Sequence, residues 1–357
     1  QEMKLRFQSI AADRGPSVTM RVLEQNNIRP LEAYEYLPSH LALLVRHKGA
    51  SNGLIVFAGK VGSGKTTSIT ALIATLPPHY KIFMIEDPVE IIVDNAIQCT
   101  VERKMDGSSD SSFKSKLFSM KRNAPDAVSL GEIRDPLTGN GVVEVGGMGT
   151  LGLFTIHAAG MLHIPERMWS DSIRIPKDFL ASPGMLKLLV YQALVHRLCS
   201  CAEPLSSLVE KGGSDWNSQW HDGPYWEQYI ARIQTMFAVD SSTMKVRNIN
   251  GCEKCRHEHF TDLNGYNSRT VIAEMMEPNS HYEMLKLIAQ GDTLGLYEFM
   301  DQLPRSPNSD PDMTNKNVVE CGIYKALIGQ VDPRDIERAT ESFESLVLQP
   351  RYAGKFQ

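Results

Sequence analysis

The sequence predicts an α/β protein whose core is a largely parallel sheet covered by helices. Residues 50–200 alternate short apolar segments with segments of helical periodicity, which is the pattern of parallel strands joined by helical crossovers. A glycine-rich stretch, residues 59–66, separates one apolar segment from one helical segment. With 357 residues, 42% hydrophobic and 22% charged, the chain has the composition of a globular protein of two or more domains.

Short apolar runs and turn signals define the expected elements of this core. The helical segment that follows the glycines ends at Pro77-Pro78. The strand candidates are Leu54–Ala58, Ile82–Ile85, Ala127–Leu130 and Leu153–Ile156.

Four parts of the chain differ in composition and pattern. Residues 1–45 are expected to form a small N-terminal α+β domain that lacks its start, because the chain opens inside a strand-like segment. Residues 46–198 form the core, and 199–256 form a cysteine-bracketed subdomain rich in Ser, Gly and Trp. Residues 257–357 complete the core and continue as a helical region.

The bulk properties exclude several classes of function. The net charge of −5 gives no electrostatic reason to expect nucleic acid as a partner. No apolar run approaches the ~20 residues that cross a bilayer, and no signal peptide is visible.

The stretch Gly-Lys-Val-Gly-Ser-Gly-Lys-Thr matches the phosphate-binding loop G-x-x-x-x-G-K-[ST]. Glycines let backbone N–H groups curl around phosphate oxygens, the lysine contacts the β- and γ-phosphates, and the threonine hydroxyl ligates Mg²⁺. The strand before it and the helix after it are the context that supports this interpretation. The expected nucleotide-binding residues are Gly59, Gly62, Ser63, Gly64, Lys65, Thr66 and Thr67.

Acidic residues and a histidine follow the next strand candidates. Glu86 and Glu90 end one strand, where they can position a water molecule or hold Mg²⁺ through its water shell; the alternative is a solvated acidic turn. Glu132 follows a later apolar run after Gly131, at the place where an acid usually orients Mg²⁺. His157 follows the last of these strands and is a candidate γ-phosphate sensor.

These four motifs together resemble the Walker A, Asp box, Walker B and His box of the secretion ATPase superfamily, whose members drive type II secretion and type IV pilus assembly or retraction. The resemblance covers nearly the whole chain, and the assembly ATPases, including the bundle-forming-pilus type, are the subfamily it favours. It implies a RecA-like ATPase core, ATP and Mg²⁺ as ligands, and a homo-hexameric ring. It also implies an inner-membrane platform protein as partner and a location at the cytoplasmic face of the inner membrane.

The resemblance further implies that arginines of the N-terminal domain reach the phosphates of a nucleotide. Arg6 and Arg21 match this role best, and Arg14 is a third candidate. A guanidinium placed there stabilises the charge that develops on the γ-phosphoryl oxygens. The alternative is that these arginines are surface charges. Glu132 would orient Mg²⁺, and the residues leave open whether Glu86 or Glu90 activates the water.

Two tight cysteine pairs predict a structural zinc site. Cys199 and Cys201 form a C-x-C pair, and Cys252 and Cys255 form a C-x-x-C pair. Four thiolates around a zinc ion would stabilise a segment that is too polar to form its own hydrophobic core. Because the family usually shows two C-x-x-C pairs, His257 or His259 is an alternative ligand, and free thiols are a third possibility. By resemblance, the cysteines favour an assembly or secretion motor over a retraction motor.

Two other features receive structural interpretations. Trp216, Trp220, Trp226, Tyr225 and Tyr229 are expected to form a small core inside the cysteine-bracketed segment rather than a docking surface. The acidic run 337–344 is expected to be a solvated helix face. The rival functions are a retraction motor, a type IV secretion or conjugation ATPase, and a nucleotide-gated scaffold with little hydrolysis.

Overall fold

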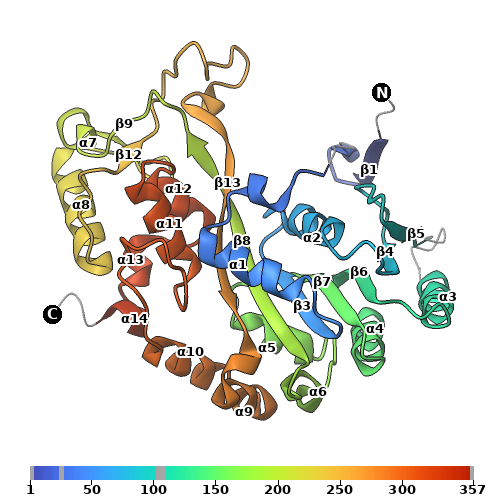
Figure 1. Cartoon of the computed structure of the whole chain (residues 1–357). Helices are drawn as coiled ribbons and strands as arrows, with labels where there is room; N and C mark the ends of the chain where they lie inside the picture. Colours follow the sequence, from blue (N-terminus) through green and yellow to red (C-terminus); the bar gives the residue numbers. More distant parts are fainter. Residues whose placement is uncertain (1–3, 24–27, 102–109, 354–357) are drawn as a thin grey trace.

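A seven-stranded, mostly parallel sheet forms the centre of the computed structural model (Figure 1). The structure describes residues 4–23, 28–101 and 110–353. The strand order is β13-β8-β3-β7-β6-β4-β5, in which neighbours run parallel except β13, which is antiparallel to β8. The expected α/β core is therefore confirmed.

The strands of the large sheet are β3 (Gly53–Ala58), β4 (Ile82–Glu86), β5 (Ala96–Thr100), β6 (Ala127–Ile133), β7 (Leu151–Ile156), β8 (Leu186–Leu198) and β13 (Tyr266–Met276). The smaller strands are β1 (Lys4–Ile10), β2 (Ser17–Leu23), β9 (Glu203–Pro204), β10 (Gly213–Ser214), β11 (Trp220–His221) and β12 (Lys245–Val246).

The helices of the first half are η1 (Leu31–Tyr34), α1 (Pro38–His47), α2 (Lys65–Ala74), α3 (Asp110–Lys121), α4 (Pro136–Gly147), α5 (His163–Trp169) and α6 (Lys177–Ala181). Those of the second half are α7 (Ser207–Lys211), α8 (Gly223–Phe237), η2 (Thr261–Leu263), η3 (Pro278–Ser280), α9 (Tyr282–Gln290), α10 (Thr293–Gln302), α11 (Val318–Leu327), α12 (Pro333–Ala339), α13 (Phe343–Leu346) and α14 (Pro350–Ala353).

Helices cover both faces of the sheet, so its central strands are buried throughout. Every residue of β3 is buried, and alternate residues point to opposite faces. Ile55 and Phe57 pack with α1 and α2 in one core, whereas Leu54 and Val56 pack in a second core with α3, α4 and the C-terminal helices. This burial on both faces explains why the strands are continuous apolar runs in the sequence.

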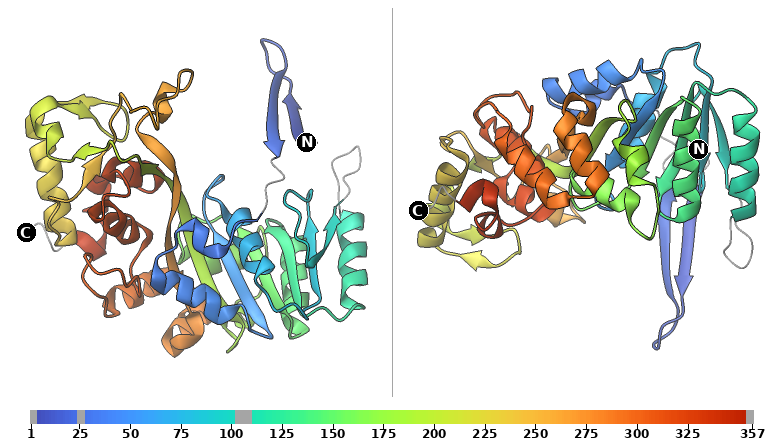
Figure 2. Two further views of the ribbon diagram at one scale, coloured as in Figure 1. Left: turned by 45° about the horizontal axis from the view of Figure 1, so that its top comes forward. Right: turned by 90° about the horizontal axis from the view of Figure 1, so that it is seen from below.

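The N-terminal region consists of a hairpin and a helical segment. Strands β1 and β2 form an antiparallel pair in which Arg6 lies directly opposite Arg21. The hairpin projects from the body of the molecule, and the side chains of residues 9–20 are all exposed (Figure 2). By contrast, Leu31 and Leu44 of η1 and α1 are buried in the core beside the sheet. We retain the four-part domain division as a proposal.

The cysteine-bracketed segment packs its main helix on the C-terminal helices. In α8, Trp226 and Tyr229 are fully buried, and the ring of Tyr229 lies 5.8 Å from that of Phe343 in α13. Trp220 is 63% exposed, so the expectation of one aromatic core inside the segment was only partly right. The rings that are buried share a core with helices from beyond the segment.

The prediction that residues 337–344 form a solvated acidic helix face was wrong for the first of them, Glu337. Glu337 is buried and accepts hydrogen bonds from the Tyr229 hydroxyl, at 2.8 Å, and from the Phe343 backbone N–H, at 2.8 Å. Glu337 therefore links α8 to α13.

Among the helices in the described ranges, none is both long and apolar enough to cross a bilayer.

Candidate nucleotide site and cysteine centre

The phosphate loop connects the end of β3 to the start of α2. Gly59, Gly62 and Gly64 all have positive φ, at 152°, 80° and 82°. A Cβ on Gly59 would lie 2.4 Å from the Gln192 carbonyl oxygen, so this position excludes every larger residue. The loop therefore presents backbone N–H groups at the N-terminus of α2, where a helix favours anions.

Lys65, His157 and Glu132 meet beside this loop. The Lys65 ammonium lies 2.9 Å from the Gly59 carbonyl oxygen and 3.3 Å from His157 Nδ1. His157 Nε2 lies 2.7 Å from Glu132 Oε1. Burial lowers the pKa of Lys65, and the nearby Glu132 carboxylate opposes that shift. The lysine is thus held in place by loop carbonyls that a phosphate group can replace.

A bulge in β6 turns Glu132 toward the loop. The pairing of β6 with β7 shifts register between Ser129 and Glu132, and Gly131 there has a φ of 60°. The Thr155 hydroxyl donates a 2.6 Å hydrogen bond to the Gly131 carbonyl and fixes the bulge. This geometry gives a physical reason for the Gly131-Glu132 sequence, since the extra residue re-aims the carboxylate.

Glu86 lies at the end of β4 in a largely buried position. Burial raises the pKa of Glu86 to about 7; a hydrogen bond from Gln98 lowers it and the charge of Glu90 raises it further. The Gln98 amide donates to Glu86 Oε2 at 2.9 Å and to the Ile91 carbonyl at 2.8 Å. Glu86 is therefore a carboxyl whose proton exchanges near neutral pH.

A cavity of about 480 Å³ brings these groups together. The phosphate loop, Glu86, Glu90, Glu132 and His157 all line it. Thr66 lines it as well and is half-buried, and Thr67 is an exposed lining residue. Every predicted site residue of this part of the chain lines the cavity except Gly59, the first residue of the loop, which packs against Gln192 and Ser63.

The N-terminal hairpin carries the predicted arginines, of which the side chains of Arg6 and Arg21 lie outside the described part of the chain. Arg14 is exposed in the turn of the hairpin, and Arg6 and Arg21 form a cross-strand pair on its strands. Among the residues whose side chains the structure describes, the arginines that line the cavity are Arg134 and Arg269. Arg134 forms a 3.2 Å ion pair with Asp87 at the acidic segment.

Sequence reasoning missed Gln192 as well as Arg269. Gln192 is fully buried on β8, and its amide donates a 2.7 Å hydrogen bond to the Ser63 carbonyl of the phosphate loop. The available signal was a single polar residue inside the apolar run of that strand. Arg269 offered no comparable signal.

The site fits a nucleoside triphosphate with Mg²⁺. The Ser63 hydroxyl is buried and has no hydrogen-bond partner among the described residues, which is an acceptor or donor left for a ligand. A lysine, the N-terminus of a helix and a threonine hydroxyl face the same cavity as the acidic groups. Thr66 and Glu132 both line this cavity and are the residues that would hold Mg²⁺ or its water shell.

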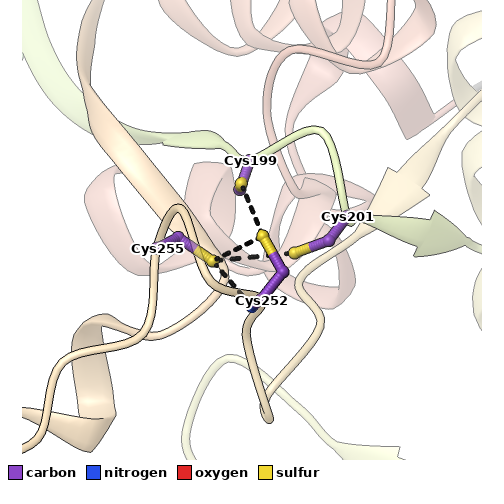
Figure 3. Close-up of side chains that lie close together, drawn as sticks. All are labelled: Cys199, Cys201, Cys252 and Cys255. Atoms are coloured by element: carbon purple, nitrogen blue, oxygen red, sulfur yellow. Dashed lines mark hydrogen bonds between the residues drawn. The ribbon is translucent and has the colours of Figure 1, made fainter.

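The four cysteines converge from two segments that are distant in sequence (Figure 3). Cys199 and Cys201 follow β8, whereas Cys252 and Cys255 precede β13. All four sulfur atoms lie within 4.8 Å of one another, and the pairs Cys199–Cys252 and Cys201–Cys255 are 3.7 and 3.6 Å apart.

These separations fit a tetrahedral metal. Zinc–sulfur bonds of about 2.3 Å in a tetrahedron place sulfurs about 3.8 Å apart. The backbone N–H groups of Cys252 and Gly265 also point to Cys255 Sγ, at 3.2 and 3.3 Å, as expected around a thiolate. His257 and His259 are exposed, and the cluster consists of cysteines. The C-x-C spacing therefore permits four sulfur ligands.

Comparisons with known proteins assign the family. The Type II/IV secretion system protein family matches residues 1–306. The chain is 30% identical over 346 residues to the "Type IV pilus assembly ATPase PilB" of Acinetobacter baylyi, covering 94% of this chain and 51% of that protein. It is 26% identical over 339 residues to the "Type II secretion system protein E" of Aeromonas hydrophila, covering 94% and 58%. The chain thus spans about half the length of these relatives.

Solved structures share the fold. The Legionella pneumophila ATPase DotB superposes with a TM-score of 0.56 at 15% identity, covering 94% of this chain and 72% of that one. The pilus retraction motor PilT with bound ADP gives 0.55 at 17% identity, covering 97% and 80%. Together with the motifs collected around the phosphate loop, the match over residues 1–306 shows that the chain belongs to the Type II/IV secretion system protein family.

Proposed function

We propose that the chain is the ATP-hydrolysing part of a hexameric motor that powers type IV pilus assembly or type II secretion pseudopilus extension. The observation that carries this proposal is the cavity that joins Lys65, Glu86, Glu132 and His157 around a phosphate loop. The relatives named as a pilus assembly ATPase and a type II secretion protein support the same assignment.

Hydrolysis is an in-line attack of water on the γ-phosphorus, which breaks its bond to the bridging oxygen and yields ADP and inorganic phosphate. Lys65 and the loop amides bind the phosphates, and His157, held by Glu132, senses the γ-phosphate. When bound, Mg²⁺ neutralises charge on the β- and γ-oxygens. Glu86 or Glu90 accepts the proton of the water; a pKa near 7 suits Glu86 to that role at neutral pH.

Arginines from a neighbouring subunit complete this site. Arg6 and Arg21 are opposite one another on an exposed hairpin, so one hairpin can deliver both guanidinium groups to the same phosphate. Arg14 at the turn is the third candidate.

The ring would act at the cytoplasmic face of the inner membrane, where movement between its domains is passed to a platform protein.

The cysteine centre distinguishes this proposal from a retraction motor. We propose that Cys199, Cys201, Cys252 and Cys255 hold a structural zinc ion, a feature that by resemblance belongs to assembly and secretion motors. A chain purified without bound metal would favour the retraction motor. The fold by itself does not separate the rival motors, since the ATPase DotB and the pilus retraction motor PilT both share it with this chain.

Single substitutions test the proposed hydrolysis. We expect Lys65→Ala and Glu132→Ala to lower ATP turnover at least about 100-fold, because each removes charge that acts on the phosphates. Lys121→Ala is the control, since Lys121 is exposed on α3 and pairs with Glu144. Turnover near wild type in either site variant would refute the mechanism, and very slow turnover in the wild-type ring would favour a nucleotide-gated scaffold.

The same assay assigns the water-activating carboxylate. Glu86→Gln and Glu90→Gln each remove one candidate base while keeping the size of the side chain. The variant with the larger fall in kcat identifies the base, and an unchanged kcat in both would exclude general-base catalysis by this segment.

A further inference from the structure

Tyr36 links the segment before α1 to the interior of the nucleotide site. It lies in residues 31–37, which follow the N-terminal hairpin in the chain and precede α1. Tyr36 is 7% exposed, and its hydroxyl is hydrogen-bonded to Ser68 Oγ of α2, at 2.9 Å, and to Gln192 Oε1 of β8. A buried phenol with two polar partners is fixed in position more firmly than apolar packing alone would fix it.

Gln192 continues this connection into the phosphate loop. Its amide donates to the Ser63 carbonyl at 2.7 Å. A Cβ on Gly64 would lie 3.3 Å from the same amide nitrogen, and one on Gly59 would lie 2.4 Å from the Gln192 carbonyl. Gln192 therefore forms a hydrogen bond with the loop at Ser63 and lies close to its glycines at positions 59 and 64, so its position and that of the loop are linked.

The residue beside Tyr36 ties the segment to α11 and to the end of β8. The ammonium of Lys325, a fully buried residue of α11, donates to the Glu35 carbonyl at 2.7 Å. The Glu35 carboxylate contacts Gln330 and Arg197, each at 2.8 Å. The segment is thus clamped between the C-terminal helices and the nucleotide site.

We propose that Tyr36 and Gln192 are positioning residues that couple docking of residues 31–37 to the nucleotide-binding conformation of the phosphate loop. Nucleotide binding tightens the segment, and the docked segment raises nucleotide affinity by the same factor, because coupling between two sites is reciprocal. In the chain, the segment follows the hairpin that carries Arg6 and Arg21 and precedes α1 of the core. This inference rests on the proposed ATP binding.

Tyr36→Phe tests the coupling in the full chain, because it deletes one hydroxyl and leaves the Gln192 oxygen without that donor. We expect its Kd for AMP-PNP to rise about tenfold. In the wild type, AMP-PNP should slow amide hydrogen exchange in residues 31–37, and in Tyr36→Phe this slowing should be lost. Tyr34→Phe is the matched control, since it removes a hydroxyl of the same segment that is hydrogen-bonded to the Arg29 backbone rather than to Ser68 or Gln192.

A purely structural role for Tyr36 would lower the melting temperature of the nucleotide-free variant and leave both readouts unchanged, and that result would overturn the inference. Gln192→Met adds a second arm: it removes the donor to Ser63 and should reproduce both effects. Suppose that the wild type binds AMP-PNP and Lys65→Ala does not. If Tyr36→Phe then shows the wild-type Kd and the wild-type slowing of exchange, the coupling is refuted but the proposed function is not. If the wild type fails to bind AMP-PNP, the proposed function and this inference both fail.

Discussion

Glu86 shows how burial alters a single residue at the candidate site. An exposed glutamate ionises near pH 4.5, but burial at the end of β4 raises the pKa of Glu86 to about 7. The folded protein therefore binds this proton more tightly than the unfolded chain does. The resulting contribution to stability is fully present below about pH 4.5 and is lost as the pH rises through about 7.

Glu86→Gln should remove this loss because the amide carries no charge. At pH 8 we expect the free energy of unfolding of the variant to exceed that of the wild type by about 1–3 kcal/mol, and at pH 4 we expect little difference. Urea denaturation at both pH values measures the effect. If the difference in the free energy of unfolding between Glu86→Gln and the wild type were the same at both pH values, the prediction would be contradicted.

Gln98→Met provides the matched comparison. It keeps Glu86 buried and removes the amide that donates to Glu86 Oε2, a hydrogen bond that lowers the pKa. The stability of this variant should decline more steeply with rising pH than that of the wild type. A shallower decline would mean that Gln98 does not favour the charged form.

At the scale of elements, the cysteine-bracketed segment divides into two parts that depend on different forces. The loops that carry the cysteines lie at the outer ends of β8 and β13 and are held by the sulfur cluster (Figure 3). Helix α8 instead packs Tyr229 and Phe237 against α13 and α14, and Trp226 is buried beside Tyr229. The proposed metal and apolar burial would therefore stabilise neighbouring elements separately.

Removal of the metal should affect these two parts unequally. The purified chain should contain about one zinc ion, and Cys252→Ser should lower that content. In the variant, hydrogen exchange should accelerate in residues 199–202 and 248–265, whereas α8 should keep its protection because its aromatic core does not involve the metal. Mass-spectrometric hydrogen exchange resolves the two regions.

Cys99→Ser is the control for this experiment, since Cys99 lies on β5, away from the cluster. Its zinc content and exchange pattern should match those of the wild type. Equal acceleration in α8 and in the cysteine loops would show that the metal holds the whole segment together.

At the scale of the whole molecule, each chain presents two halves of the proposed site. The phosphate loop and its acidic groups lie on one part of the body, whereas the arginine-bearing hairpin projects away from it (Figure 2). A closed ring of identical chains brings the same two surfaces together at every interface. Efficient hydrolysis should then require assembly.

Mixing two inactive variants tests whether the arginines act between chains. Lys65→Ala lacks a working loop, and the double variant Arg6→Ala/Arg21→Ala lacks the arginines. Each should be inactive alone, but rings reassembled from an equal mixture should recover up to about a quarter of wild-type turnover, since some interfaces then combine two intact halves. If the mixture forms mixed rings and stays inactive, the arginines do not act between chains: they serve the phosphate loop of their own chain, or they take no part in hydrolysis.

Local sequence alone predicted the elements whose signals are local. The strand candidates at 54–58, 82–85, 127–130 and 153–156 lie within β3, β4, β6 and β7, which are neighbours in the sheet. Apolar runs mark buried strands, and glycines mark positive φ, wherever the chain folds. The phosphate loop and the two tight cysteine pairs were accessible for the same reason, although the meeting of the two pairs is a long-range contact.

Only the tertiary structure decided the features that depend on residues far apart in the chain. Glu337 belongs to an acidic run, yet its burial follows from Tyr229, more than a hundred positions away. Gln192 and Tyr36 gain their place in the nucleotide site from a sheet that puts β8 beside β3. The sequence by itself determined which chemical groups are present and which local shapes hold them; burial and long-range contacts decided which of those groups share a site, because side-chain environment is a property of the packed molecule.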